Sequence, residues 1–156
     1  MPIAFRILPE LALVHVTYSG VAGLAETIEG TAACAAHPDF RPSHRHLVDL
    51  RGIDDFERDL PGFLSMQARV IDHFPIIGDG FHPFMMVMIA PSGPARGMAE
   101  QVRRTWEGLE GALVRVVVDE ASALSVLGLE GRGTAVFEPA APPTADETGA
   151  DRWTLR

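Results

Sequence analysis

The stretch "HLVDLRGIDDF" joins a short apolar run to charged residues that could bind a ligand. Asp49 and Arg51 close the apolar run, and Asp54 and Asp55 follow a few residues later. A guanidinium among carboxylates can hold a small acidic molecule, but these groups can also satisfy one another. Asp49 in particular can accept backbone N–H bonds or pair with Arg51. We favour this structural role over a binding role.

The same acidic residues are weak candidates for a cation site. A calcium-binding loop needs regularly spaced oxygen ligands, a turn glycine and a terminal glutamate. The run from Asp54 to Asp59 lacks that pattern, so we expect a solvated acidic loop.

Zinc and thiol chemistry have little support either. His44 and His46 are two residues apart, so they would share one face of a strand, but no third ligand follows at a recognisable spacing. We expect these histidines to face solvent, and we expect no metal and no cofactor. Cys34 is the only cysteine and has no neighbouring base, which favours a packed, inert thiol. The chain has no lysine, so a Schiff-base mechanism is excluded.

A second polar segment, "APSGPARG", opens a predicted helix and offers Ser92 and Arg96. Arg96 in the first turn could hold an anion against the positive end of the helix dipole. Pro94 removes one N–H that an anion would use, and proline is common at the first position of a helix. An ordinary helix start is therefore the simpler interpretation.

The elements that must position these residues alternate along the chain. Strands are expected where apolar residues run together between turn signals, and helices where they recur every three or four residues. Pro9 suits the corner of an opening hairpin, and Pro38 ends the first helix. The predicted order is a hairpin over residues 3–20, a helix over 21–36, a strand over 45–50, a helix over 60–74, a strand over 84–90, a helix over 95–109, a strand over 113–118 and a helix over 120–129.

This alternation predicts an α/β fold with a mixed sheet. Strands separated by helices call for parallel pairing through right-handed βαβ crossovers, and the N-terminal hairpin adds an antiparallel pair. Residues 1–128 are expected to form the domain. Residues 129–156 are rich in proline, alanine and acids and are expected to be a flexible tail. Within them, "TAVFEP" could add an edge strand, and Trp153 could dock on the domain or on a second copy.

Composition excludes several classes of function. The net charge of −8 repels phosphate backbones, so no nucleic acid partner is expected. The longest apolar run, "FMMVMIA", is far shorter than the ~20 residues that span a bilayer, and the N-terminus does not resemble a signal peptide. We therefore expect a cytoplasmic protein with no membrane partner.

Four short stretches carry a family resemblance: a hairpin ending in "VTYSG", "HPDF" followed by "HLVDLRGI", "IAPSGPARGMAEQV", and "VRVVVDEASALSVL". Their order and spacing resemble the SpoIIAA-like branch of the STAS superfamily, named for sulfate transporters and anti-sigma factor antagonists, over residues 3–128. The chain departs from several related sequences at Val126, where they have tryptophan, and at Arg96, where an aromatic residue is frequent.

The resemblance implies a STAS-like fold but not the serine switch of the best-understood members. Those proteins carry a phosphorylatable serine at the start of the helix that corresponds to residues 60–74. No serine or threonine occurs from Arg51 to Leu64, and Ser65 falls inside the predicted helix. Asp59 lies near the expected position and could imitate a phosphorylated residue. A helix-capping role for Asp59 is the simpler interpretation.

We therefore expect a non-enzymatic binding module that acts by contact with a protein partner or as a homodimer. The alternative is a carrier or sensor of a small apolar or anionic metabolite, with the ligand beside Asp49, Arg51, Asp54, Ser92 and Arg96. An enzyme would need a histidine and an acid converging in a pocket. A further apolar pocket or interface could involve Ile76, Ile77, Phe81 and Met85.

Overall fold

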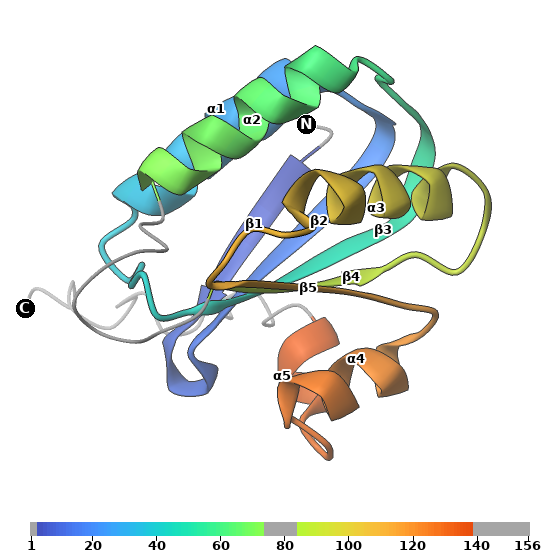
Figure 1. The fold of residues 1–156 in the computed structure, drawn as a ribbon. Helices are drawn as coiled ribbons and strands as arrows, with labels where there is room; N and C mark the ends of the chain where they lie inside the picture. Colours follow the sequence, from blue (N-terminus) through green and yellow to red (C-terminus); the bar gives the residue numbers. More distant parts are fainter. Residues whose placement is uncertain (1–2, 74–83, 139–156) are drawn as a thin grey trace, which may run out of the picture.

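The computed structural model describes residues 3–73 and 84–138, which form a five-stranded sheet with helices on both faces (Figure 1). None of the helices in these ranges is long and apolar enough to cross a bilayer. The strands are β1 (Ile3–Leu8), β2 (Leu13–Ala22), β3 (Arg45–Phe56), β4 (Phe84–Ile89) and β5 (Ala112–Val117). The helices are α1 (Leu24–Ala36), α2 (Leu60–His73), α3 (Gly93–Trp106), α4 (Glu120–Leu127) and α5 (Gly133–Phe137), with a 3-10 turn at Pro9–Leu11.

Each strand lies beside the strand that precedes it in the chain, so the sheet order is β1-β2-β3-β4-β5. β1 and β2 are antiparallel and the other pairs are parallel, which confirms the predicted mixed α/β sheet. Right-handed crossovers that always advance in one direction place their helices on one face of the sheet. Accordingly α1, α2 and α3 lie together on one face, whereas α4 and α5 lie on the other (Figure 1).

The two faces of the sheet build two separate apolar cores. Side chains alternate along each strand: Val14 and Met88 join the larger core under α1, α2 and α3. Leu13 and Val87 join the smaller core against α4 and α5. β4 therefore contributes to both cores, which explains why its apolar run is continuous rather than alternating.

β3 is longer than predicted, which corrects the expected acidic loop. The strand runs on to Phe56 instead of ending before Gly52, so Asp54 and Asp55 belong to the strand. Gly52 permits this continuation, because a Cβ atom at that position would lie only 2.8 Å from the carbonyl oxygen of Tyr18. A residue that looked like a strand terminator is thus a point of close approach between two strands.

β2 also runs further than predicted, which shortens the first helix. Val21 pairs with Asp55 beyond two register shifts, so it belongs to β2 and not to a helix beginning at residue 21. α1 begins at Leu24 instead. Helical periodicity in the sequence did not reveal that this segment pairs with an extended β3.

Residues 129–138, which were assigned to the predicted tail, continue the domain, and the rest of that tail lies outside the described residues. Residues 133–137 form α5 rather than an edge strand, and Val136 is completely buried. Arg6 of β1 donates hydrogen bonds to the carbonyl oxygens of Val136 and Glu138, the latter at 2.8 Å. The packed domain therefore extends at least to Glu138. Trp153, and the pocket candidates Ile76, Ile77 and Phe81, lie outside the described residues.

Candidate functional site

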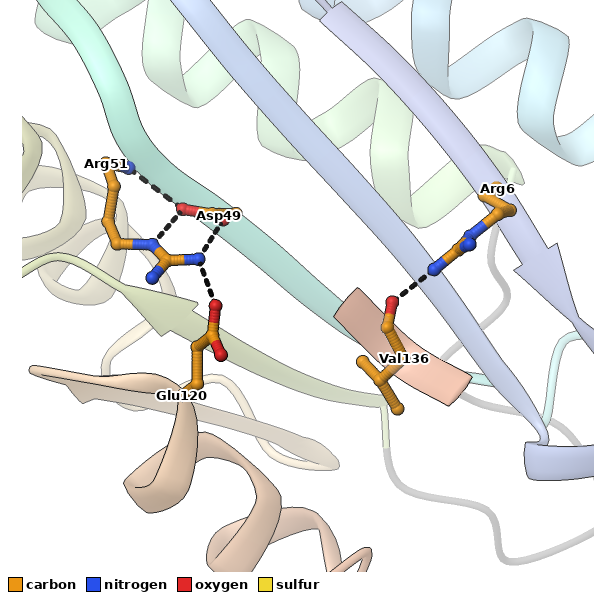
Figure 2. A network of polar contacts seen from close by, with 5 residues as sticks. All are labelled: Arg6, Asp49, Arg51, Glu120 and Val136. Atoms are coloured by element: carbon orange, nitrogen blue, oxygen red, sulfur yellow. Dashed lines mark hydrogen bonds and ion pairs between the residues drawn. The ribbon is translucent and has the colours of Figure 1, made fainter. Parts of the chain in front are cut away.

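Asp49, Arg51 and Glu120 form a polar cluster on the face of the sheet that carries α4 and α5 (Figure 2). The Arg51 side chain donates two hydrogen bonds to the Asp49 carboxylate, from Nε at 3.0 Å and from Nη2 at 2.7 Å. The backbone N–H of Arg51 donates a third bond to Asp49 at 3.0 Å. Nη2 of Arg51 also contacts Glu120, at 2.9 Å. Both structural roles considered for Asp49, backbone acceptor and partner of Arg51, are therefore present.

Local structure fixes these three side chains. Alternation along β3 places Asp49 and Arg51 on the same face of the sheet as Leu47. Asp119 caps α4 by accepting a hydrogen bond from the backbone N–H of Ser122 at 2.8 Å. This cap sets the first turn of α4, and with it Glu120, opposite the Arg51 guanidinium.

The electrostatics of the cluster favour a closed ion pair over an open binding site. Burial is the largest influence on Asp49 and opposes its ionisation, but the hydrogen bonds and charge of Arg51 outweigh it. The pKa of Asp49 consequently lies below its ordinary value. The pKa of Arg51 is raised, first by its hydrogen bond to Asp49 and then by Glu120. The guanidinium already faces two carboxylates, so it is poorly placed to attract a third anion.

We expect Asp49→Asn to lower the free energy of unfolding at pH 7 by about 1.5–3 kcal/mol, because hydrogen bonds to a charged partner are lost. Asp49 has a lowered pKa in the folded state, so its contribution is present above the unfolded pKa of about 3.9 and is lost as the pH falls further. The two proteins should therefore converge in stability at low pH. Urea unfolding at pH 7 and at pH 3 measures both effects.

Glu120→Gln is the matched control for this prediction. The Glu120 side chain is 44% exposed, against 12% for Asp49. Exposed ion pairs contribute little, so the cost should stay below about 1 kcal/mol. An equal loss from both substitutions would contradict the structural role assigned to Asp49.

A histidine does lie near Asp49, but it forms no catalytic pair with it. His15 of β2 is buried on the same face of the sheet, and its ring meets Phe137 edge-on with centroids 5.6 Å apart. Burial, and then the charge of Arg6, lower the pKa of His15 despite the nearby Asp49 carboxylate. Within the described chain, Nε2 of His15 has no hydrogen-bond partner, and Asp49 is bonded to Arg51 instead.

The other predicted site residues do not join the cluster. Arg96 pairs with Glu100 on α3 at 3.2 Å. Ser92 is exposed at the N-cap position of α3 and makes no side-chain capping bond. Asp54 is exposed near the end of β3. Among the described residues no hydrogen bond or ion pair joins Asp54, Ser92 or Arg96 to Asp49 and Arg51, and the ligand-binding role of the five residues stays a prediction.

Asp59 stands directly before α2, where a capping residue is expected. Its carbonyl oxygen accepts a hydrogen bond from the Phe63 backbone N–H at 2.9 Å. Among the described residues its carboxylate makes no capping bond, although one carboxylate oxygen lies close to Gly62. Asp59 thus stands at the start of α2 without the side-chain capping bond that was expected, and its regulatory role stays a prediction.

A second candidate site is an apolar cavity of about 90 Å³ inside the larger core. It lies between helices α1, α2 and α3 and the face of β1–β4 that these three helices cover. Most of its lining is aliphatic, aromatic or methionine, and four methionines contribute. The methionines are Met66, Met86, Met88 and Met98.

The titratable side chains that line this cavity are all uncharged at pH 7. Burial raises the pKa of Tyr18 to about 12 and that of Cys34 to about 11. Burial, and secondarily the charge of His44, lower the pKa of His46 to about 4. The Tyr18 hydroxyl lies 3.1 Å from Oγ1 of Thr27, whose own hydroxyl donates to the Gly23 carbonyl at 2.8 Å. The cavity therefore suits a neutral, apolar occupant.

The histidine pair at the start of β3 is buried, which corrects the expectation that it faces solvent. His44 and His46 are only 6% and 5% exposed. Phe40 meets the His44 ring edge-on at 6.1 Å, and Phe84 lies 5.0 Å from the His46 ring. In residues 3–73 and 84–138, no three His, Cys, Asp or Glu side chains gather as a potential metal site.

Sequence reasoning missed Glu120 and the cavity. Glu120 is 69 residues from Arg51 in the chain and looks like an ordinary acid in the first turn of a helix. The cavity is a gap between side chains from seven elements, so no local pattern encodes it. The alternating Phe84, Met86 and Met88 of β4 were a partial signal, because they mark one face of the strand as adaptable.

The comparisons with known proteins assign no family. No family model matches the chain, and none of the curated proteins compared with it matches either. The STAS-like resemblance therefore stays a prediction that rests on the order and spacing of short stretches.

Proposed function

We propose that this chain is a non-enzymatic binding module that holds a small, neutral, apolar molecule between its sheet and helices α1, α2 and α3. The observation that supports the proposal is the apolar cavity in the larger core. The proposal moves the ligand from the charged residues of β3 that were expected to bind it to the opposite face of the same strand. His46, Val48 and Leu50 line the cavity, whereas alternation along β3 places Asp49 and Arg51 on the opposite face with Leu47.

The volume of the cavity limits its occupant. An apolar cavity of about 150 Å³ in another protein stays dry and binds benzene. At about 90 Å³ this cavity is smaller, so its occupant has few carbon atoms unless the lining moves. Methionine side chains are flexible and adapt to irregular contents. Four methionines in the lining therefore allow a larger molecule to be admitted than the empty volume suggests.

We expect benzene to shift the methyl signals of Met66, Met86, Met88 and Met98 in a titration of methyl-labelled protein followed by NMR. Met85 is the internal control, because it lies on the same strand but packs against the smaller core. Benzoate should leave all these signals unchanged, because its carboxylate would be buried without a partner. Cys34→Leu fills part of the cavity and should abolish the benzene shifts.

Two results would contradict the cavity as a ligand site. One is the absence of any shift at saturating benzene. The other is an equal shift of Met85 and the four cavity methionines, which would indicate nonspecific contact with the whole domain.

The second candidate function is contact with a protein partner, which the STAS-like resemblance implies. Two observations favour it. The outer edge of β5 has no strand neighbour in the described chain, and a groove lies between this edge and α3.

A further inference from the structure

β5 is the last strand of the sheet, so one of its edges has no neighbouring strand in the described chain (Figure 1). The Phe84 N–H donates to the Gly111 carbonyl at 2.8 Å, and the Ala90 N–H donates to the Val117 carbonyl at 2.9 Å. These bonds show that the odd-numbered residues along β5 direct their polar groups toward β4. In a regular parallel ladder the alternate residues direct theirs the other way. The backbone groups of Val114 and Val116 therefore point outward.

Part of this edge is already engaged. Nη1 of Arg115 donates to the Val114 carbonyl at 3.2 Å. Within the described residues, the Val114 N–H and both polar groups of Val116 are left for solvent or a partner. A charged residue on an edge strand also limits uncontrolled pairing with other strand edges. Arg115 thus occupies one backbone acceptor of the edge and leaves the other outward-facing groups available for pairing.

A groove of about 510 Å³ runs between this edge and α3. This volume lies within the range of typical ligand pockets. Trp106 and Val114 are buried below it and supply an apolar floor. The charged residues along the groove are Arg96, Glu100, Arg103, Glu107 and Arg115.

The charges along the groove favour an acidic occupant. Glu100 pairs with both Arg96, at 3.2 Å, and Arg103, at 2.9 Å, so one carboxylate is shared by two guanidinium groups. Three arginines against two glutamates leave the groove with a positive surplus, in a chain whose net charge is −8. A positive site on an acidic protein is complementary to a negatively charged partner.

We propose that this groove binds an extended, acidic segment of a partner protein, which adds to the sheet as a strand beside β5. The added backbone pairs with Val114 and Val116, as in other cases of strand addition. Alternate side chains of the segment meet the apolar floor on the face covered by α3, and the intervening acidic side chains lie on the opposite face, on the side of Arg115. An acidic side chain that pairs with Arg115 also releases the Val114 carbonyl for the new strand. This inference rests on the second candidate function, protein contact, and is independent of the cavity.

A second copy of this chain fits the same edge less well. Two β5 edges brought together would place the same arginines on both sides of the new pairing. Like charges that face each other across strands are destabilising. A separate acidic segment has no such conflict.

The test uses a fluorescein-labelled octapeptide of four Val-Glu repeats, whose alternation separates apolar from acidic side chains. Its binding to the full-length chain is followed by fluorescence anisotropy. Arg115→Glu should weaken binding at least tenfold. Val116→Pro should do the same, because it removes the outward-facing Val116 N–H with which the added strand pairs. Proline is tolerated on edge strands, so the variant should still fold. Circular dichroism melts establish that each variant is folded. If Val116→Pro does not fold, the proposal is tested with Arg115→Glu alone.

Arg104→Glu is the matched control, because Arg104 is exposed on α3 but does not line the groove. It should change the affinity less than twofold, and a peptide of four Val-Lys repeats should not bind. Equal losses from Arg104→Glu and Arg115→Glu, or no binding of the acidic peptide, would overturn the proposal. So would a dimer in light scattering that Arg115→Glu dissociates. A natural partner that binds the edge variants as well as the wild type would overturn the edge site and leave protein contact standing.

Discussion

Acidification from pH 7 to pH 4 should lower the free energy of unfolding by about 3 kcal/mol more in the wild-type protein than in His46→Leu. His46 is buried among apolar residues, and burial lowers its pKa to about 4, whereas an unfolded histidine has a pKa near 6.5. The unfolded state therefore binds a proton at a pH where the folded state does not. The contribution of neutral His46 is fully present above pH 6.5 and is lost as the pH falls toward 4.

Urea unfolding at half-unit steps between pH 7 and pH 4 measures this difference. Protonation of carboxylates affects both proteins, so the comparison isolates the histidine. His37→Leu is the matched control for loss of a histidine, because His37 is exposed at the end of α1. Parallel curves for wild type and His46→Leu would contradict the assignment of the acid sensitivity to His46.

Protonation of His46 also changes the charge of the cavity lining. His46 lines the cavity, and the other titratable lining groups, Tyr18 and Cys34, have raised pKa values and stay neutral in acid. His44 lies beside His46, and its pKa is also lowered, by burial and by the charge of Arg41. Acid thus places positive charge at the edge of an apolar core.

Phe63→Ala should lower the free energy of unfolding by about 3–5 kcal/mol, the usual cost of removing a buried phenylalanine ring. Phe63 is 1% exposed and meets the Phe56 ring edge-on, with centroids 6.4 Å apart. It therefore joins the first turn of α2 to the end of β3. A loss of this size is a large part of the 5–15 kcal/mol that stabilises a typical domain. Urea unfolding at pH 7 measures it.

The neighbouring Leu64 provides a control on the same helix. Leu64 is 50% exposed, so Leu64→Ala should cost less than about 1 kcal/mol. Similar losses at the two positions would mean that the burial pattern of α2 is wrong.

The element order up to α4 could be predicted from the sequence because each of these elements carries its own signal, whereas α5 was not predicted. The hairpin has a proline at its corner, α2 has an apolar face, and β4 has a continuous apolar run. The bounds of β3 could not be predicted, because Gly52 is a common strand terminator and its actual role depends on Tyr18 in the neighbouring strand. The extra residues of β2 followed from the same pairing.

The candidate site was predicted only where its partners are close in sequence. Asp49 and Arg51 are two residues apart, so their pairing could be proposed from the sequence. Glu120 comes from another element, and the burial of His44 and His46 depends on rings such as Phe84 that are distant in the chain. Family membership, the protein partner and homodimer formation stay predictions.

The strand order has a consequence for how the chain folds. Because every strand pairs with its predecessor, the sheet can grow during synthesis by adding one neighbour at a time, without a long loop to close. The contacts of the sheet with α4 and α5 are exceptions, and the one between Arg6 and Val136 joins positions 130 residues apart. The Arg6 side chain can therefore make this bond only after α5 has been synthesised, so docking of α5 couples the first strand to a helix formed late in synthesis.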